Sequence, residues 1–147
     1  MSHVRKQIRD QLLSTITGLA TTGSKAYASR VYPLDTGKLP AVIVYTLSED
    51  SIESAFSKRR EQDRQLEAVV EGYVRALNTF DDTLDQIASE VEAAILADTT
   101  LGGLAKNVEL TGTDTDYAGD SEQPVGTVRL TFRIQYRTVT GSPNSAI

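Results

Sequence analysis

Strict alternation of apolar and polar residues near the end of the chain constrains its fold more than any other feature. The polar positions are Thr127, Arg129, Thr131, Arg133, Gln135 and Arg137, and the apolar positions between them are Val128, Leu130, Phe132, Ile134 and Tyr136. A period of two is typical of a β-strand that buries one face and exposes the other. The chain must therefore contain a sheet with one face packed against other elements and one polar face.

Earlier segments predict the other strands of this sheet. Alternation from Tyr27 to Tyr32, closed by Pro33, indicates a first strand, and residues 41–47 are apolar on both faces, which predicts a central strand. A third strand is expected over residues 64–75 and a fourth around residues 107–113. The face of the third strand that we expect to be buried carries Leu66, Ala68, Val70, Gly72 and Val74.

Two amphipathic segments predict helices. The first buries Val4, Ile8, Leu12, Ile16 and Leu19, which recur every three or four residues, and we expect Ser2 to be its N-cap. The second begins with a capping box formed by Thr79 and Asp82 and runs to about Ala97. Each helix has one apolar face, so each must lie on the sheet.

The predicted element order is α-β-β-β-α-β-β, which defines the α+β class. One mixed or mostly antiparallel sheet of about five strands, with two helices packed on one face, accounts for every apolar face and leaves the other sheet face polar and uncovered. The 147 residues suit a single domain, which we place at residues 1–138. Within it, residues 48–63 are expected to form a long mobile hairpin loop, and residues 139–147 a flexible C-terminal tail.

Composition argues against several classes of function. The protein has a net charge of −5 and therefore lacks the basic surface of a nucleic-acid-binding protein. No segment has the character of a secretory signal or membrane anchor. There are no cysteines, and the only histidine, His3, has no neighbouring nucleophile or carboxylate in the sequence. The acidic segment 114–125 departs from the EF-hand pattern at Ala118 and Val125. We therefore predict no catalytic residues, no metal site and no cofactor, and hence that the protein is not an enzyme.

Two groups of basic residues are the candidate interaction sites. Arg129, Arg133 and Arg137 lie on the polar face of the last strand, either to contact a neighbouring subunit or an acidic partner, or to pair with Glu67 and Glu71 across an adjacent strand. The second group lies at the base of the expected hairpin and comprises Lys58, Arg59, Arg60 and Arg64. It either engages an acidic partner or carries solvated charge.

The second helix is strongly acidic and has no lysine or arginine. Its early aspartates favour the positive end of the helix dipole, but Glu90 and Glu92 gain nothing from that effect. This face is therefore either solvated or in contact with a basic surface.

The ordered set of elements resembles the tail terminator proteins of siphophages, the minor tail protein U-like family. The resemblance rests on the amphipathic N-terminal helix, the strand Leu39-Pro40-Ala41-Val42-Ile43-Val44-Tyr45, and the C-terminal half from Val108 through Gly119 and Asp120 to Glu122-Gln123-Pro124-Val125-Gly126-Thr127-Val128 and Tyr136. It covers nearly the whole chain, as strand patterns rather than as a diagnostic motif.

The resemblance implies a structural virion protein. Such proteins form a ring, usually a hexamer, on the head-proximal end of the tail tube, where they stop tube polymerisation and offer a surface to the neck or head completion protein. The implied partners are the chain itself, the tail tube protein and the neck protein, with DNA only as cargo passing through the lumen and no membrane. Assembly in the host cytoplasm and a final place in the virion tail follow. Another head-to-tail joining protein is the alternative, and a small cytosolic ligand-binding domain or enzyme is a more distant one.

Overall fold

The computed structural model describes residues 2–28, 39–53, 60–75, 79–118 and 125–147. Its element order is α1 (Val4–Ile16), β1 (Ala26–Ala28), β2 (Ala41–Glu53), β3 (Glu61–Arg75), α2 (Phe80–Leu96), β4 (Asn107–Ala118), β5 (Val125–Val139) and β6 (Ser142–Ala146). The strands form one sheet in the order β1-β2-β3-β5-β4, and β6 pairs with the end of β5. This arrangement confirms the predicted α+β class and adds one short strand.

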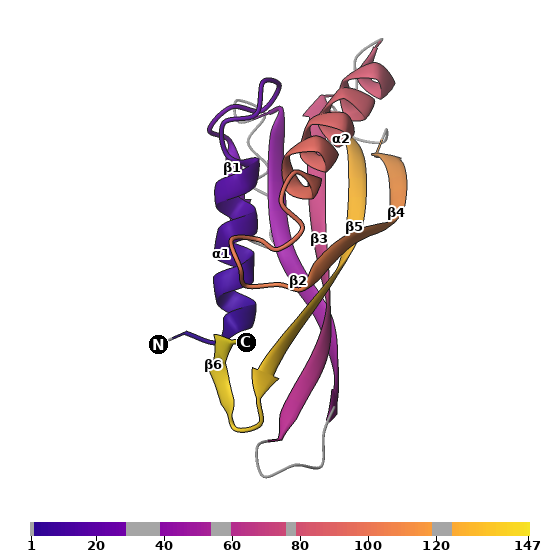
Figure 1. Cartoon of the computed structure of the whole chain (residues 1–147). Coiled ribbons are helices and arrows are strands. Elements are labelled where there is room, and N and C mark those ends of the chain that lie inside the picture. The colour runs from indigo at the N-terminus through magenta and orange to yellow at the C-terminus, as the bar shows by residue number, and fades with distance from the viewer. Residues whose placement is uncertain (1, 29–38, 54–59, 76–78, 119–124) are drawn as a thin grey trace.

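The sheet is mixed because one of its pairings is parallel. β1 runs parallel to β2, and the pairings of β2 with β3, β3 with β5, β4 with β5 and β5 with β6 are antiparallel. Both helices lie on one face of the sheet, with α1 over the β1–β2 side and α2 over the β3–β5–β4 side (Figure 1). The long strands β2 and β3 continue together past the N-terminal end of α1 as the β2–β3 ribbon, and β5 pairs with β3 there as far as Val139.

The core lies between the helices and the sheet, where the sequence predicted it. The alternating apolar residues of β5 are almost fully buried there with the stripes of α1 and α2. Gly72 lies in the middle of β3, and a Cβ added to it would approach Ile87 Cγ2 of α2 to 2.7 Å. Residue 72 is therefore a point where the second helix lies close against the sheet.

Both predicted helix caps are wrong in detail. His3, not Ser2, is the N-cap of α1, and its Nδ1 accepts a hydrogen bond from the backbone N–H of Arg5 at 3.0 Å. Thr79 is the N-cap of α2 but makes no side-chain cap hydrogen bond, so the capping box with Asp82 is not formed. A cap depends on local backbone angles, which a residue pattern does not specify.

Two predicted loops are largely strand. The expected hairpin loop 48–63 is paired up to Glu53 in β2 and again from Glu61 in β3, and residues 54–59 lie outside the described part of the chain. In the expected C-terminal tail, Ser142–Ala146 forms β6, and the N–H of Ile147 donates to the carbonyl of Arg137. Both corrections have one cause: backbone pairing with a neighbouring strand needs no apolar side-chain pattern.

The sheet face away from the helices is not uniformly open. Ile43 and Val69 are fully buried there, and Glu71 is only 5% exposed. The expectation of a polar, uncovered face is therefore correct for the region around Arg133 but wrong for the centre of the sheet. The two-sided apolar character of residues 41–47 already indicated burial on both faces.

Candidate interaction face

The outer face, defined as the sheet face away from the helices, is organised by the register of β5 with its neighbours. The arginines at positions 129, 133 and 137 form one column along β5. Opposite them on β3 stand Glu71, Glu67 and Asp63, and two of them also face Asp114 and Glu109 on β4. Because directly opposite side chains on one face lie about 5 Å apart, each arginine has a carboxylate within reach.

Glu71 is the most buried charged group of this face. Its carboxylate accepts hydrogen bonds from Tyr45 Oη at 2.5 Å, from Arg129 Nε at 3.0 Å and from the Tyr73 hydroxyl. Burial, together with the hydrogen bond to Glu71, raises the pKa of Tyr73, and the nearby carboxylate raises the pKa of Arg129. Glu71 is thus internally satisfied, as the predicted pairing with Arg129 required.

Arg137 also pairs across the sheet. Its Nε lies 2.5 Å from Asp63 Oδ1, and its Nη1 lies 3.6 Å from Glu61 Oε2. The side chains of Arg137 and Asp63 are 40% and 48% exposed, so solvent screens the pair. This end of the column is neutralised but accessible.

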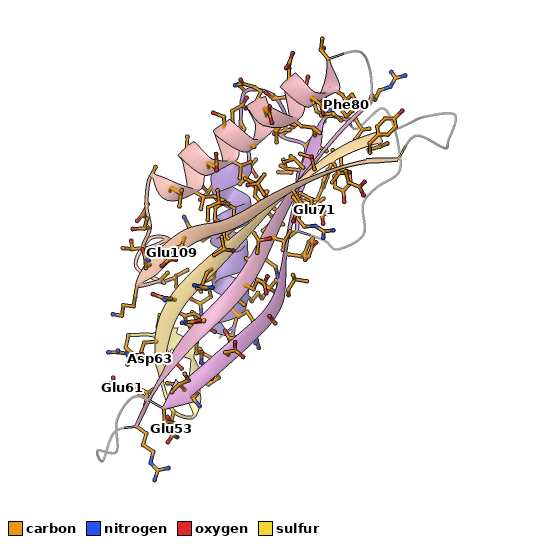
Figure 2. The ribbon with its side chains drawn as sticks, turned by 90° about the vertical axis from the view of Figure 1, so that its right-hand side faces the viewer. Glu53, Glu61, Asp63, Glu71, Phe80 and Glu109 are labelled. Atoms are coloured by element: carbon orange, nitrogen blue, oxygen red, sulfur yellow. The ribbon has the colours of Figure 1, made fainter. Side chains whose placement is uncertain are left out.

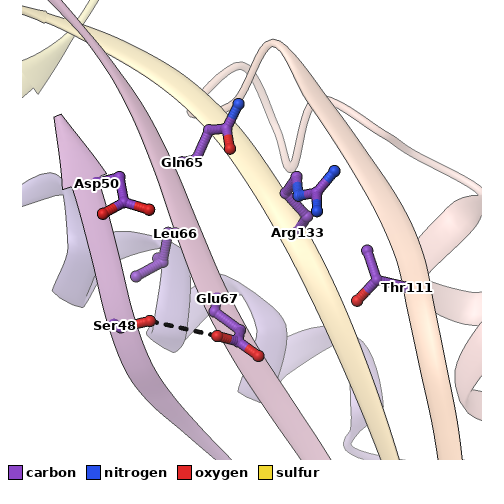
Figure 3. Close-up of a pocket in the computed structure, with 7 residues that line it drawn as sticks. All are labelled: Ser48, Asp50, Gln65, Leu66, Glu67, Thr111 and Arg133. Atoms are coloured by element: carbon purple, nitrogen blue, oxygen red, sulfur yellow. Dashed lines mark hydrogen bonds between the residues drawn. The ribbon is translucent and has the colours of Figure 1, made fainter. Parts of the chain in front are cut away.

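Arg133 differs from the other two arginines. It stands between Glu67 and Glu109, yet it forms no hydrogen bond or ion pair with any residue in the described ranges. Glu67 instead accepts a hydrogen bond from Ser48 Oγ at 3.2 Å (Figure 3). The predicted pairing of Arg133 with Glu67 is therefore wrong, and the guanidinium is available to a partner.

A shallow hollow surrounds Arg133. It has a volume of about 180 Å³ and is lined by Ser48, Asp50, Gln65, Leu66, Glu67, Thr111 and Arg133. Figure 3 shows these side chains, which come from β2, β3, β4 and β5. Polar groups dominate and no group of catalytic side chains converges there, so the hollow suits a contact with another protein surface rather than a small-molecule site.

The second basic group is not a cluster in the structure. Lys58 and Arg59 lie outside the described residues, and Arg60 is exposed beside the start of β3. Arg64 points to the helix side of the sheet, where its side chain is only 11% exposed. Arg64 is thus separated from the outer face, and Arg60 is the described member of this group that solvent reaches freely.

A buried ionic network around Glu49 was not predicted. The Glu49 carboxylate lies 3.1 Å from both Arg5 Nη1 of α1 and Arg64 Nη1 of β3, and it also accepts a hydrogen bond from the Tyr136 hydroxyl. Arg64 additionally donates from Nε to Thr138 Oγ1 at 3.1 Å. The network ties the start of α1 to three strands at the root of the β2–β3 ribbon.

Glu49 escaped prediction because of a β-bulge. Between Thr46 and Glu49 the register of β2 shifts, so Glu49 pairs with Leu66 and faces the helices. Simple alternation from Ile43 and Tyr45 would have placed it on the outer face. The sequence signal that could have found it is weak: a charged residue directly after the apolar run.

The pH dependence of stability should include a contribution from His3. Burial, reinforced by Arg5 and Arg64, lowers the pKa of His3 below its ordinary value of 6.5. Below pH 6.5, His3 is protonated in the unfolded chain but still neutral in the folded chain. The free energy of unfolding therefore falls as the pH decreases toward the pKa of His3 in the folded state. We expect His3→Asn, which retains an N-cap acceptor, to lose less stability than the native chain between pH 7 and 5 in urea titrations. Identical pH profiles would contradict this expectation.

The described residues offer little to chemistry other than binding. No group of three histidine, aspartate or glutamate side chains within them could hold a metal ion. No described helix is long and apolar enough to cross a membrane. The carboxylates of the outer face are seen in Figure 2 along strands β3 and β4, on the side of the sheet opposite the helices. Fold and site together define an α+β protein with a charged, largely neutralised sheet face.

Comparisons with known proteins identify the family. The model of the phage minor tail protein U family matches residues 3–136, so the chain belongs to that family. It is a structural protein of a phage tail, and its place is in the virion. Among solved structures, a chain of the virion of a native gene transfer agent particle has 14% sequence identity and a TM-score of 0.48 over 90% of each chain. A comparison with curated protein sequences gives no significant match.

Proposed function

We propose that this protein is a tail terminator. A ring of subunits, six in the simplest case, caps the head-proximal end of the tail tube, stops its polymerisation and presents a surface to the neck or head completion protein. The observation that carries this proposal is the family match over residues 3–136. The protein acts by occupying a surface, so the proposal requires no catalysis and no cofactor.

The β2–β3 ribbon is a suitable element for contacting the tail tube. It extends beyond α1 as paired strands up to Glu53 and from Glu61, with Ile52 70% exposed and Arg60 exposed at its far end. A paired ribbon loses less conformational entropy on binding than the mobile loop expected from the sequence would. We assign the tube contact to this ribbon; Lys58 and Arg59, which precede Arg60 in the sequence, are expected contacts from the sequence alone.

The charge of the subunit suits passage of DNA. With a net charge of −5, the protein does not release counterions from the phosphate backbone as a basic wall would, so DNA is not retained. DNA is therefore proposed as cargo in the lumen rather than as a ligand. The accessible Arg133 lies between Glu67 and Glu109, which gives it a locally acidic surrounding and makes it a contact for a protein partner.

Tail length is the measurement that tests the terminator function. Particles produced without this protein are expected to have tail tubes several-fold longer than normal and no attached heads, because nothing stops tube growth. Supplying the protein in trans should restore one tail length, as measured by negative-stain electron microscopy.

Two other outcomes are informative in this experiment. Headless tails of normal length in its absence would contradict the terminator role and favour a head-to-tail joining protein. Normal particles in its absence would contradict both roles.

A further inference from the structure

The two helices carry opposite charge. Helix α2 contains five carboxylates and no basic residue, whereas α1 contains three basic residues and one aspartate. The acidic set is Asp81, Asp82, Asp85, Glu90 and Glu92, and the basic set is Arg5, Lys6 and Arg9. Both helices cover the same sheet face, but they lie toward opposite edges of it (Figure 1).

Part of the acidic set lies on the outer flank of α2, the side toward β4. Glu90 accepts hydrogen bonds from Thr21 N at 2.8 Å and from its hydroxyl at 2.5 Å, so that side of α2 faces the segment after α1. Asp85 and Glu92 lie roughly 150° around the helix from Glu90, on the opposite side. At the start of α2, Phe80 stacks on Tyr117 of β4 with ring centroids 5.4 Å apart, so the N-terminal end of the helix lies over β4.

Two members of the basic set, Arg5 and Arg9, lie on the outer flank of α1, toward the part of β2 from Leu47 to Glu53, whereas Lys6 pairs with Asp10 at 2.7 Å on the solvent-facing side. Arg5 Nη1 reaches Glu49, and Arg9 Nη1 lies 3.5 Å from Thr46 Oγ1, so both arginines extend over β2. Gln7, on the other side of α1, donates to the carbonyl of Asn144 in β6. β1 pairs only with Val42–Val44. From Leu47 to Glu53, the edge of β2 that faces away from β3 therefore has no described partner strand, and we call this segment the free part of β2.

Exposed apolar residues gather on the same two flanks. Within the described residues, the large apolar side chains with the greatest exposure are Leu47, Ile52, Leu96 and Tyr117, at 49%, 70%, 38% and 53%. Leu47 and Ile52 belong to the free part of β2. Leu96 follows Glu92 by one helical turn, and Tyr117 lies on β4, whose outer edge has no described partner strand. An unpaired edge with exposed apolar residues is a surface for pairing with another chain.

We propose that the α2–β4 flank of one subunit docks against the α1–β2 flank of a second copy. Asp85 and Glu92 would face Arg9 of the next subunit, with the exposed apolar residues between the strand edges. Since the complementary surfaces lie on opposite sides of one molecule, the contact is head-to-tail, and it builds the proposed ring when the rotation between successive copies closes. This inference rests on the proposed ring and names the surfaces that build it.

Disulfide cross-linking tests this contact cleanly because the native chain has no cysteine. A chain carrying both Arg9→Cys and Glu92→Cys is expected to give, under mild oxidation, a ladder of covalent oligomers that ends at the full ring. Each single variant should give dimers at most. The matched control, Asp10→Cys with Ser89→Cys, places both thiols on the solvent-facing sides of the same helices and should give at least ten-fold less ladder. The measurement is made on purified protein and on particles complemented with each variant.

Charge reversal provides a second readout. Asp85→Lys with Glu92→Lys, and separately Arg9→Glu, should each reduce ring formation at least ten-fold, and the three changes in one chain should restore it. The variant Asp82→Lys with Ser89→Lys adds similar positive charge away from the flank and should assemble normally.

The outcomes separate this inference from the terminator function. Rings that form without the expected ladder, or that resist both reversals, overturn the assignment of the two flanks while leaving the terminator function intact. Normal tail length in particles that lack the protein overturns the function itself.

Discussion

Replacing Glu49 with glutamine is expected to destabilise the fold by about 3 kcal/mol, because it removes one member of a buried ion network. The Glu49 side chain is 6% exposed, and its carboxylate is shared by Arg5, Arg64 and the Tyr136 hydroxyl. Glutamine has nearly the same shape but no charge, so the guanidinium of Arg64, at 11% exposure, would remain buried without its counter-charge. Urea unfolding followed by far-UV circular dichroism measures the loss.

Glu67→Gln is the matched control for Glu49→Gln. Glu67 lies on the adjacent strand and allows the same substitution. Its side chain is exposed, and its carboxylate accepts only a hydrogen bond from Ser48 at 3.2 Å. Its replacement should change the free energy of unfolding by less than about 0.5 kcal/mol. Equal effects at the two positions would contradict the assignment of a buried network to Glu49.

Gly72→Ala is expected to destabilise the fold by about 2 kcal/mol through overpacking. The new Cβ would lie 2.7 Å from Ile87 Cγ2 and 3.1 Å from Val128 Cγ1. Ile87 is 1% exposed and Val128 is fully buried, so neither side chain has free space to move into. Thermal unfolding should show a decrease in the melting temperature of roughly 6 °C for a domain of this size.

Gly112→Ala on β4 is the control for Gly72→Ala. A Cβ at residue 112 would meet nothing within 4 Å, and its backbone φ is outside the left-handed region. This substitution should be neutral or slightly stabilising, since alanine loses less conformational entropy on folding. A loss at residue 112 as large as that at residue 72 would argue against steric contact with α2 as the cause.

The order of the predicted elements was enough to indicate the family, but not the pairing of individual side chains. The order of helices and strands, together with the apolar stripes that cover the sheet, was sufficient to predict the α+β class and the resemblance to tail terminators. It did not distinguish the three arginines of β5. Arg129 pairs with Glu71 as expected, Arg137 pairs instead with Asp63 and Glu61, and Glu67 accepts a hydrogen bond from Ser48 rather than pairing with Arg133.

The proposed subunit contact depends on the same distinction between local and tertiary information. The acidic character of α2 was evident from its sequence, but two interpretations, solvation and contact with a basic surface, remained open. Only the placement of Glu90 against Thr21 orients the helix about its axis. That orientation turns Asp85 and Glu92 toward the β4 edge.

The sequence by itself determined which residues of β5 are buried and which stripes of α1 and α2 face the sheet. These features follow from periods of 2 and 3.6 residues, which any regular strand or helix obeys. Only the tertiary structure decided that Glu49 lies on the helix side and that Ser142–Ala146 forms a strand. The reason is physical: the bulge in β2 and the pairing of β6 are set by hydrogen bonds to a neighbouring strand, which no local periodicity encodes.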